Sequence, residues 1–112
     1  MKCPCCGEFV INDELQLKLY HAQHGVNGIG GDGFDFNSWY RCEKHNKAVG
    51  GSETSSHLKG LAVDIKIHNS THRFLVLQAL IKAGFTRIGI GKTFIHADID
   101  MSKSQNLIWL YK

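Results

Sequence analysis

The sequence predicts an α+β fold in which a small antiparallel sheet is flanked by helices. Residues 12–24 and 70–83 have the apolar spacing and the end signals of helices. Several short segments alternate apolar and polar residues, as half-buried strands do. The 112-residue chain has 43% hydrophobic residues, one proline and no repeat or linker, and we therefore expect a single domain over residues 1–112.

The first predicted helix begins after Asn12, which can cap it, and ends near His24, before Gly25. Its expected apolar face consists of Leu15, Leu17, Leu19, Tyr20 and Ala22. The glycine-rich residues 25–34 follow, and we interpret them as a loop at the rim of a cleft. They lack the lysine and the strand-to-helix context of a phosphate-binding loop.

The middle of the chain contains two predicted strands and a short helix. Residues 34–40 (FDFNSWY) alternate in a β-prone pattern, and the charged residues 41–48 are typical of a short helix that ends at a pair of glycines. Residues 60–67 (GLAVDIKI) alternate aliphatic and other residues, which predicts a strand with Asp64 on the face opposite to the aliphatic row.

The second long helix is predicted to be capped by Ser70, to run over residues 71–83 and to end at Gly84. Its expected core face is formed by Phe74, Leu77, Leu80 and Ile81.

Three β-prone segments close the chain, at residues 87–91, 93–100 and 107–112, and we expect them to form an antiparallel meander. In the second of these segments, alternation places His96 and Asp98 on the same face.

Charge and hydropathy exclude several classes of partner. The net charge is +3 and the basic residues are scattered, so the chain shows no nucleic-acid-binding pattern. No segment approaches the roughly 18 apolar residues of a membrane span, and the first residues lack the apolar stretch of a signal peptide. We therefore expect a protein made in the cytoplasm, without a nucleic-acid or membrane partner. A monomer is our expectation for its oligomeric state, which these patterns do not address.

His57, Asp64 and His96 form a candidate metal site. Zinc needs three or four nitrogen, sulfur or carboxylate ligands around one point, and a catalytic site keeps one position open for water. A glycine-containing segment separates His57 from Asp64, so a loop residue and a strand residue can meet at one strand end, while His96 lies on another strand. Because the chain contains seven histidines, spacing alone leaves a solvent-exposed polar face as the alternative.

These residues lie in motifs that resemble the family of zinc D-alanyl-D-alanine carboxypeptidases and L-alanyl-D-glutamate endopeptidases, which shares its fold with hedgehog signalling domains. The main motif of that family is Ser-x-His-x-x-Gly-x-Ala-x-Asp, and residues 55–64 (SSHLKGLAVD) satisfy every specified position. A second motif appears at residues 38–51 (SWYRCEKHNKAVGG), with Trp39 in place of the usual glycine, and a third at residues 94–98 (FIHAD). The resemblance covers nearly the whole chain and is strongest to the short phage and prophage versions.

The resemblance implies a hedgehog/DD-peptidase-like fold and a zinc peptidase that hydrolyses peptide bonds in peptidoglycan stem peptides, as a phage endolysin or a virion-associated lysin does. It implies that His57, Asp64 and His96 bind Zn²⁺, that Arg41 binds a substrate carboxylate or carbonyl, and that Ser55 lines the same cleft. We expect action on the bacterial cell wall after release from the cytoplasm, or as part of a virion. A non-catalytic zinc-containing module of the same fold is the alternative.

The general base departs from the family pattern. In many relatives it is a Glu, Asp or His three residues before the last ligand histidine, but this position is Thr93, which does not take a proton at neutral pH. Asp98 shares a strand face with His96 and is therefore the candidate catalytic residue. Orientation of a ligand histidine is the alternative role of Asp98. The sequence leaves open which peptide bond is cut.

The cysteines allow a second interpretation. Cys3 and Cys6 form a CxxC pair and Cys42 forms a CxxH pair with His45, which is the ligand set of a structural zinc ribbon at an unusually long separation. The other hypothesis is a disulfide outside the cytosol between Cys42 and either Cys5 or Cys6, which would tie the N-terminus to the second motif.

Overall fold

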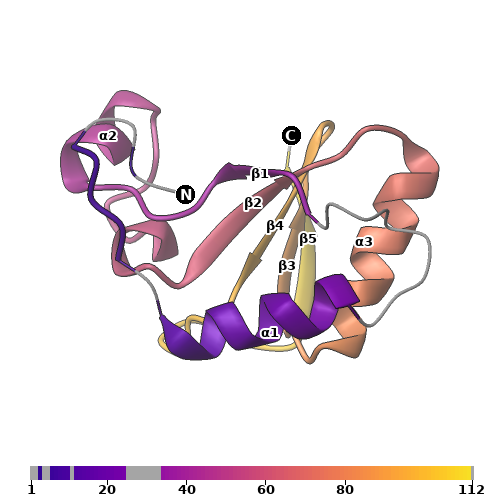
Figure 1. Ribbon diagram of the computed structural model, residues 1–112. Coiled ribbons are helices and arrows are strands. Elements are labelled where there is room, and N and C mark those ends of the chain that lie inside the picture. The colour runs from indigo at the N-terminus through magenta and orange to yellow at the C-terminus, as the bar shows by residue number, and fades with distance from the viewer. Residues whose placement is uncertain (1–2, 4–5, 11, 25–33, 112) are drawn as a thin grey trace.

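The computed structural model describes residues 3, 6–10, 12–24 and 34–111, and Figure 1 shows the arrangement of their helices and strands. The elements, in chain order, are α1 (Asp13–His24), β1 (Phe36–Ser38), α2 (Glu43–Ala48), the 3-10 helix η1 (Ser56–Lys59), β2 (Ala62–Lys66), α3 (Ser70–Lys82), β3 (Arg87–Ile90), β4 (Phe94–Asp98) and β5 (Leu107–Leu110). The α+β class is confirmed, and each predicted helix and strand has its counterpart. The predicted loop at residues 25–34 lies outside the described residues, except for Phe34.

The five strands form one mixed sheet in the order β1-β2-β4-β3-β5. The first three pairings along this order are antiparallel, whereas β5 is parallel to β3. The prediction of an antiparallel meander is therefore wrong for the last strand. Both edges of β4 are already paired, with β2 and with β3, so β5 cannot pair with β4 and joins the other edge of β3 instead. Residues 99–106 are long enough to carry the chain past the end of β3, which a tight hairpin turn could not do.

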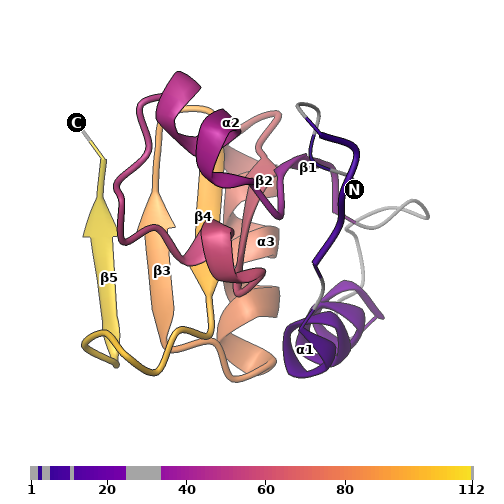
Figure 2. The ribbon, with the colours of Figure 1, turned by 90° about the vertical axis from the view of Figure 1, so that its left-hand side faces the viewer.

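One face of the sheet packs against α1 and α3 and forms the core. Alternation along β2, β3 and β4 directs aliphatic side chains to this face, where they are buried: Val63, Ile65, Ile88, Ile95 and Ala97. Leu15 and Leu19 from α1 and Leu80 from α3 are fully buried against them, and each contributes about 1.5–3 kcal/mol relative to an exposed side chain. Figure 2 shows α3 behind the sheet, and α2 and η1 in front of it.

The end of α1 nearest the N-terminus agrees with the prediction, because the side chain of Asn12 accepts a hydrogen bond of 3.0 Å from the Leu15 N–H. Its predicted apolar face is only partly correct, since Leu17 and Tyr20 are exposed. Only the side of the helix that carries Leu15, Leu19 and Ala22 reaches the core.

Two predictions for α3 are wrong. The capping residue is Asn69 rather than Ser70, since the Asn69 side chain accepts a hydrogen bond of 2.8 Å from the His72 N–H. Phe74 and Ile81 are 64% and 51% exposed, and the buried residues are Val76, Ala79 and Leu80. The helix is apolar on almost every side, and the periodicity of such a helix does not define which side meets the sheet.

The opposite face of the sheet is polar, and the remaining elements position its side chains. The charged segment forms α2, which ends before Gly50 and Gly51 as predicted.

The described helices include none with the length and apolarity that a membrane crossing requires.

Candidate metal centre

The candidate metal ligands come from three elements on the polar face of the sheet. Asp64 in β2 and His96 in β4 are directly opposite each other in the antiparallel register, so their side chains leave the sheet as cross-strand neighbours. His57 belongs to η1, which packs against β2. Ser55 caps η1 and accepts a hydrogen bond of 3.2 Å from the His57 N–H, and Gly60 ends it in the left-handed conformation that favours glycine.

The structure brings the three predicted ligands together. The Asp64 carboxylate lies between the two imidazoles, with Oδ2 3.3 Å from His57 Nε2 and Oδ1 2.9 Å from His96 Nδ1. One nitrogen or oxygen atom from each residue lies within 4.8 Å of those of the other two. Both histidines are buried and Asp64 is half-buried, so the cluster is not a solvent-exposed strand face.

The second nitrogen of each histidine is held by an acceptor. His57 Nδ1 lies 2.6 Å from the carbonyl oxygen of Trp39, and His96 Nε2 lies 2.7 Å from Asp98 Oδ2. Since a carbonyl and a carboxylate accept, these two ring nitrogens donate. His57 Nε2 and His96 Nδ1 are thereby directed at Asp64 and present the atoms that a metal would need.

The electrostatics favour an anion between the histidines. Burial by itself raises the pKa of Asp64, but hydrogen bonds and positive charge from His57 and His96 outweigh it and hold this pKa well below the usual range. Burial lowers the pKa of His96, while hydrogen bonds to Asp64 and Asp98 outweigh this effect and raise it. Two imidazole nitrogens and one carboxylate oxygen, with a position left for water, are a donor set that fits a catalytic zinc ion.

Asp98 lies behind His96 and is 1% exposed. Its Oδ1 accepts hydrogen bonds from Arg87 Nε at 2.7 Å and from the Asp100 N–H at 3.1 Å, while Oδ2 accepts from His96. Both carboxylate oxygens are therefore engaged. Sequence reasoning missed Arg87, although its place opposite Asp98 follows from the register of β3 and β4. Thr93, at the usual position of the base, is exposed in the bend just before β4.

A pocket of about 450 Å³ opens beside the three ligands. Its lining includes Arg41, Ser55, Phe94, Trp109 and Tyr111. Arg41 Nη2 donates a hydrogen bond of 3.3 Å to Ser55 Oγ, so both predicted substrate-binding residues lie at the pocket. Tyr111 is a pocket residue that sequence reasoning missed, and the alternation of β5, which puts it on the side of Trp109, is the signal that indicates it.

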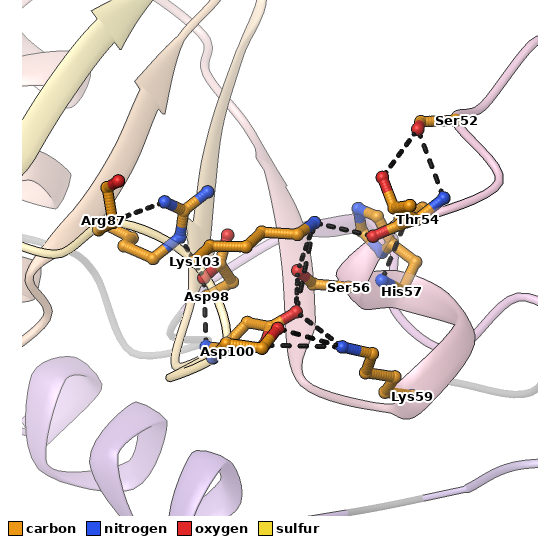
Figure 3. A network of polar contacts seen from close by, with 12 residues as sticks. Ser52, Thr54, Ser56, His57, Lys59, Arg87, Asp98, Asp100 and Lys103 are labelled. Carbon is orange, nitrogen blue, oxygen red and sulfur yellow. Dashed lines mark hydrogen bonds and ion pairs between the residues drawn. The ribbon is translucent and has the colours of Figure 1, made fainter.

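A network around Asp100 ties η1 to the chain after β4, as Figure 3 shows. Asp100 is 1% exposed and accepts hydrogen bonds from Ser56 Oγ at 2.7 Å and Ser102 Oγ at 2.6 Å. Lys59 Nζ lies 3.2 Å from its Oδ2. Since Ser56 and Lys59 belong to the same helix turn as His57, this buried carboxylate positions the ligand.

Replacing Asp100 with asparagine is expected to destabilise the fold by about 1–3 kcal/mol, because donors are left without an acceptor in a buried site. Burial raises the pKa of Asp100, but hydrogen bonds from Ser102 and Ser56 outweigh it and keep the pKa well below the usual range. The stabilisation is therefore present above the unfolded-state pKa of about 3.9 and is lost as the pH falls below it. Urea unfolding at pH 7 and at pH 3 measures this: the difference between wild type and Asp100→Asn should shrink at pH 3.

Asp35→Asn is the matched control, because the Asp35 side chain is 56% exposed and its contact with His68 is long, at 3.6 Å. It should change stability by less than about 0.5 kcal/mol. Equal losses from both variants would contradict a positioning role for Asp100.

The thiol groups of Cys3, Cys6 and Cys42 form a second cluster, in which the three Sγ atoms lie within 4.8 Å of one another. The expected proximity of Cys6 to Cys42 is confirmed. The structure contains Cys6 and Cys42 as thiols rather than as a disulfide, and Cys5 lies outside the described residues.

Comparison with known proteins agrees with the geometry. A family model described as Peptidase M15 matches residues 9–100, a range that includes all three candidate ligands. No curated protein and no solved structure is significantly similar to the chain. The α+β architecture with its small sheet is compatible with the hedgehog/DD-peptidase-like fold that the motifs implied. Since the match covers most of the chain, the protein belongs to the Peptidase M15 family of zinc metallopeptidases.

Proposed function

We propose that this metallopeptidase hydrolyses peptide bonds in the stem peptides of peptidoglycan. The observation that carries the proposal is the placement of an arginine at the same pocket as the two histidines and the carboxylate. A peptide carbonyl at the metal position would therefore have a guanidinium beside it that can hold a carboxylate of the same substrate.

His57 Nε2, the Asp64 carboxylate and His96 Nδ1 would hold the zinc ion, because the second ring nitrogen of each histidine is already engaged and both Asp64 oxygens face the histidines. When bound, zinc acts as a Lewis acid on a scissile carbonyl and makes water a better nucleophile at neutral pH. The protein's own contribution is to fix the ligands: the Trp39 carbonyl orients His57, and Asp98 orients His96.

Arg41 is suited to bind the substrate. Its guanidinium is half-buried, and burial lowers its pKa while the charge of Asp64 opposes this effect, so the group stays protonated at neutral pH. Arg41 Nε is buried and has no hydrogen-bond partner among the described residues. A buried donor without a partner is costly, and a substrate carboxylate would satisfy it bidentately together with Nη. Stem peptides carry such carboxylates.

Two roles are open to Asp98, as general base or as the partner that orients His96. Its contacts support the second role, because both of its oxygens already accept hydrogen bonds and Oδ2 lies against the nitrogen of His96 that points away from Asp64. We therefore assign Asp98 a positioning role through His96.

The cell-wall setting is part of the same proposal. Resemblance of the motifs to short phage and prophage enzymes supports a lysin that acts on the bacterial wall after leaving the cytoplasm or as part of a virion. The net charge of +3 favours approach to an anionic wall.

Mass spectrometry of purified peptidoglycan after incubation with zinc-loaded protein tests the proposal, with His57→Ala as the control. We expect a new peptide terminus that the control does not produce, and the residue at this terminus distinguishes a carboxypeptidase from an endopeptidase. If folded, zinc-loaded protein released nothing from several wall chemotypes, the proposal would fail in favour of a non-catalytic module of the same fold.

A further inference from the structure

We propose that Cys3, Cys6 and Cys42 bind a second, structural zinc ion that fastens the N-terminal segment to α2. This site shares no residue with the candidate metal centre, and the proposal does not rest on peptidase activity.

The spacing of the thiols fits tetrahedral zinc. With Zn–S bonds of about 2.3 Å, the sulfur atoms of a tetrahedral site lie about 3.8 Å apart. Cys3 Sγ and Cys42 Sγ are 3.6 Å apart, and Cys6 Sγ lies within 4.8 Å of both. Cys3 is buried, Cys42 is half-buried and Cys6 is exposed, so an ion has access from the side of Cys6.

The backbone folds the CxxC pair into a tight turn. The Gly7 N–H donates to the Cys3 carbonyl at 2.8 Å, and the Cys3 N–H donates to the Glu8 carbonyl at 2.8 Å. Gly7 has a φ of +74°, in the left-handed region that a side chain disfavours. Among the described residues, no atom lies within 4 Å of the place that a Cβ would take at Gly7, and it is the backbone conformation that favours glycine here. The turn directs Cys3 and Cys6 towards the same point.

Backbone N–H groups point at two of the sulfur atoms. The Cys42 N–H lies 3.5 Å from Cys3 Sγ, and the His45 N–H lies 3.4 Å from Cys42 Sγ at the start of α2. Donors of this kind stabilise a thiolate, which is the form that binds zinc, and they orient the ligand as outer partners do in metal sites.

His45 follows Cys42 by three residues in α2 and is half-buried, but its ring nitrogens lie outside the group formed by the three sulfur atoms, so it would become the fourth ligand only by turning its side chain towards them. Three cysteines and one histidine are a common structural zinc set. The experiment below tests His45 in this role.

A zinc ion at this site would act on the neighbouring pocket through the backbone. Cys42 follows Arg41, whose N–H donates to the His57 carbonyl at 3.2 Å. Phe9, three residues after Cys6, packs edge-to-face on Trp39 with ring centroids 5.5 Å apart, and the Trp39 carbonyl accepts from His57. Two chains of contacts thus lead from the thiol cluster to the metal centre: one runs from Cys42 through Arg41 to His57, and the other runs from Cys6 through Phe9 and Trp39 to His57.

Metal content under reducing conditions tests the proposal in the full chain. Wild type is expected to bind two zinc ions, Cys6→Ser and His57→Ala one each, and the double variant none. Cobalt substitution adds a direct readout: thiolate-to-cobalt charge transfer in the near ultraviolet should appear in wild type and in His57→Ala, and be lost in Cys6→Ser. His45→Ala tests the fourth ligand: loss of its imidazole should leave the charge-transfer band of the thiolates in place and shift the visible d–d bands of the bound cobalt, whereas unchanged d–d bands would exclude His45.

A single zinc ion in reduced wild type, with no charge-transfer band in His57→Ala loaded with cobalt, would overturn the proposal. The proposal would also be overturned if the intact mass of protein purified without reductant were lower by two hydrogens and the protein bound no second zinc ion after reduction. The cysteines would then form a disulfide rather than a metal site. The cobalt spectrum of His57→Ala keeps the test valid even where Cys6→Ser fails to fold. A protein that binds two zinc ions but shows no peptidase activity would contradict the proposed peptidase function and leave the proposal of a structural zinc ion intact.

Discussion

Asp64→Asn is expected to abolish peptidase activity and to weaken zinc binding by more than about 100-fold, which exceeds the loss usually seen when only an outer partner of a ligand is removed. The carboxylate contacts both ligand histidines, at 3.3 Å from His57 and 2.9 Å from His96, so its charge and one of its oxygens face the metal position directly. Asparagine keeps the shape of the side chain but removes the negative charge that would balance the ion. Competition with a chromophoric chelator measures the affinity.

The measurement is best made in a Cys6→Ser background, so that thiol-bound zinc does not contribute. Asp35→Asn supplies the same chemical change at an exposed position, and it should alter neither zinc affinity nor activity. An Asp64→Asn variant that kept the affinity and turnover of the wild type would exclude Asp64 as a metal ligand.

Asp98→Asn is expected to lower zinc affinity by about 10–100-fold and to lower turnover in proportion, with most of the turnover restored by excess zinc. The reason is that Asp98 Oδ2 fixes the imidazole of His96 through its Nε2, at 2.7 Å, and a carboxylate accepts this hydrogen bond more strongly than an amide. A general base would give another result: a loss of about 10²–10⁴-fold in kcat that zinc does not restore, together with a change in the acid limb of the pH profile.

Removing the charge of Asp98 also leaves the buried Arg87 without its anion, and breaking such a pair costs about 3–5 kcal/mol. Arg87→Gln is the matched variant, because it breaks the same ion pair and leaves the carboxylate in place. Thermal unfolding should show similar losses for the two variants, whereas only Asp98→Asn should change zinc affinity strongly. Equal effects of both on zinc affinity would mean that the ion pair, rather than the contact with His96, supports the site.

The metal ligands were predictable for two reasons. Residues 55–64 satisfy every specified position of the family motif, and the alternation of a strand determines the face on which each of its residues lies. Asp64 and His96 both leave the polar side of the sheet, as predicted. The convergence of His57 on them was not predictable from spacing, since it depends on η1 being held by Asp100, a residue 43 positions away from His57 along the chain.

The errors have a common physical origin in contacts between distant segments. Arg87 was missed because its segment is typical of an aliphatic strand, and only the register with β4 shows that it faces Asp98. Phe74 and Ile81 were assigned to the core because α3 is apolar around most of its circumference. The strand character of β5 was predictable from its residues, whereas its pairing with β3 depends on the strand order of the sheet, which the local pattern does not contain.

The position of β4 in the sheet gives the metal centre two different levels of local stability. β4 is paired along both edges, so its amide hydrogens exchange only when the sheet itself opens, and His96 shares that protection. His57 belongs to a helix of a single turn, which can open locally at much lower free energy. Loss of the ion would therefore begin on the side of His57, with His96 and Asp64 still in register, so a vacated site could rebind zinc without refolding the sheet.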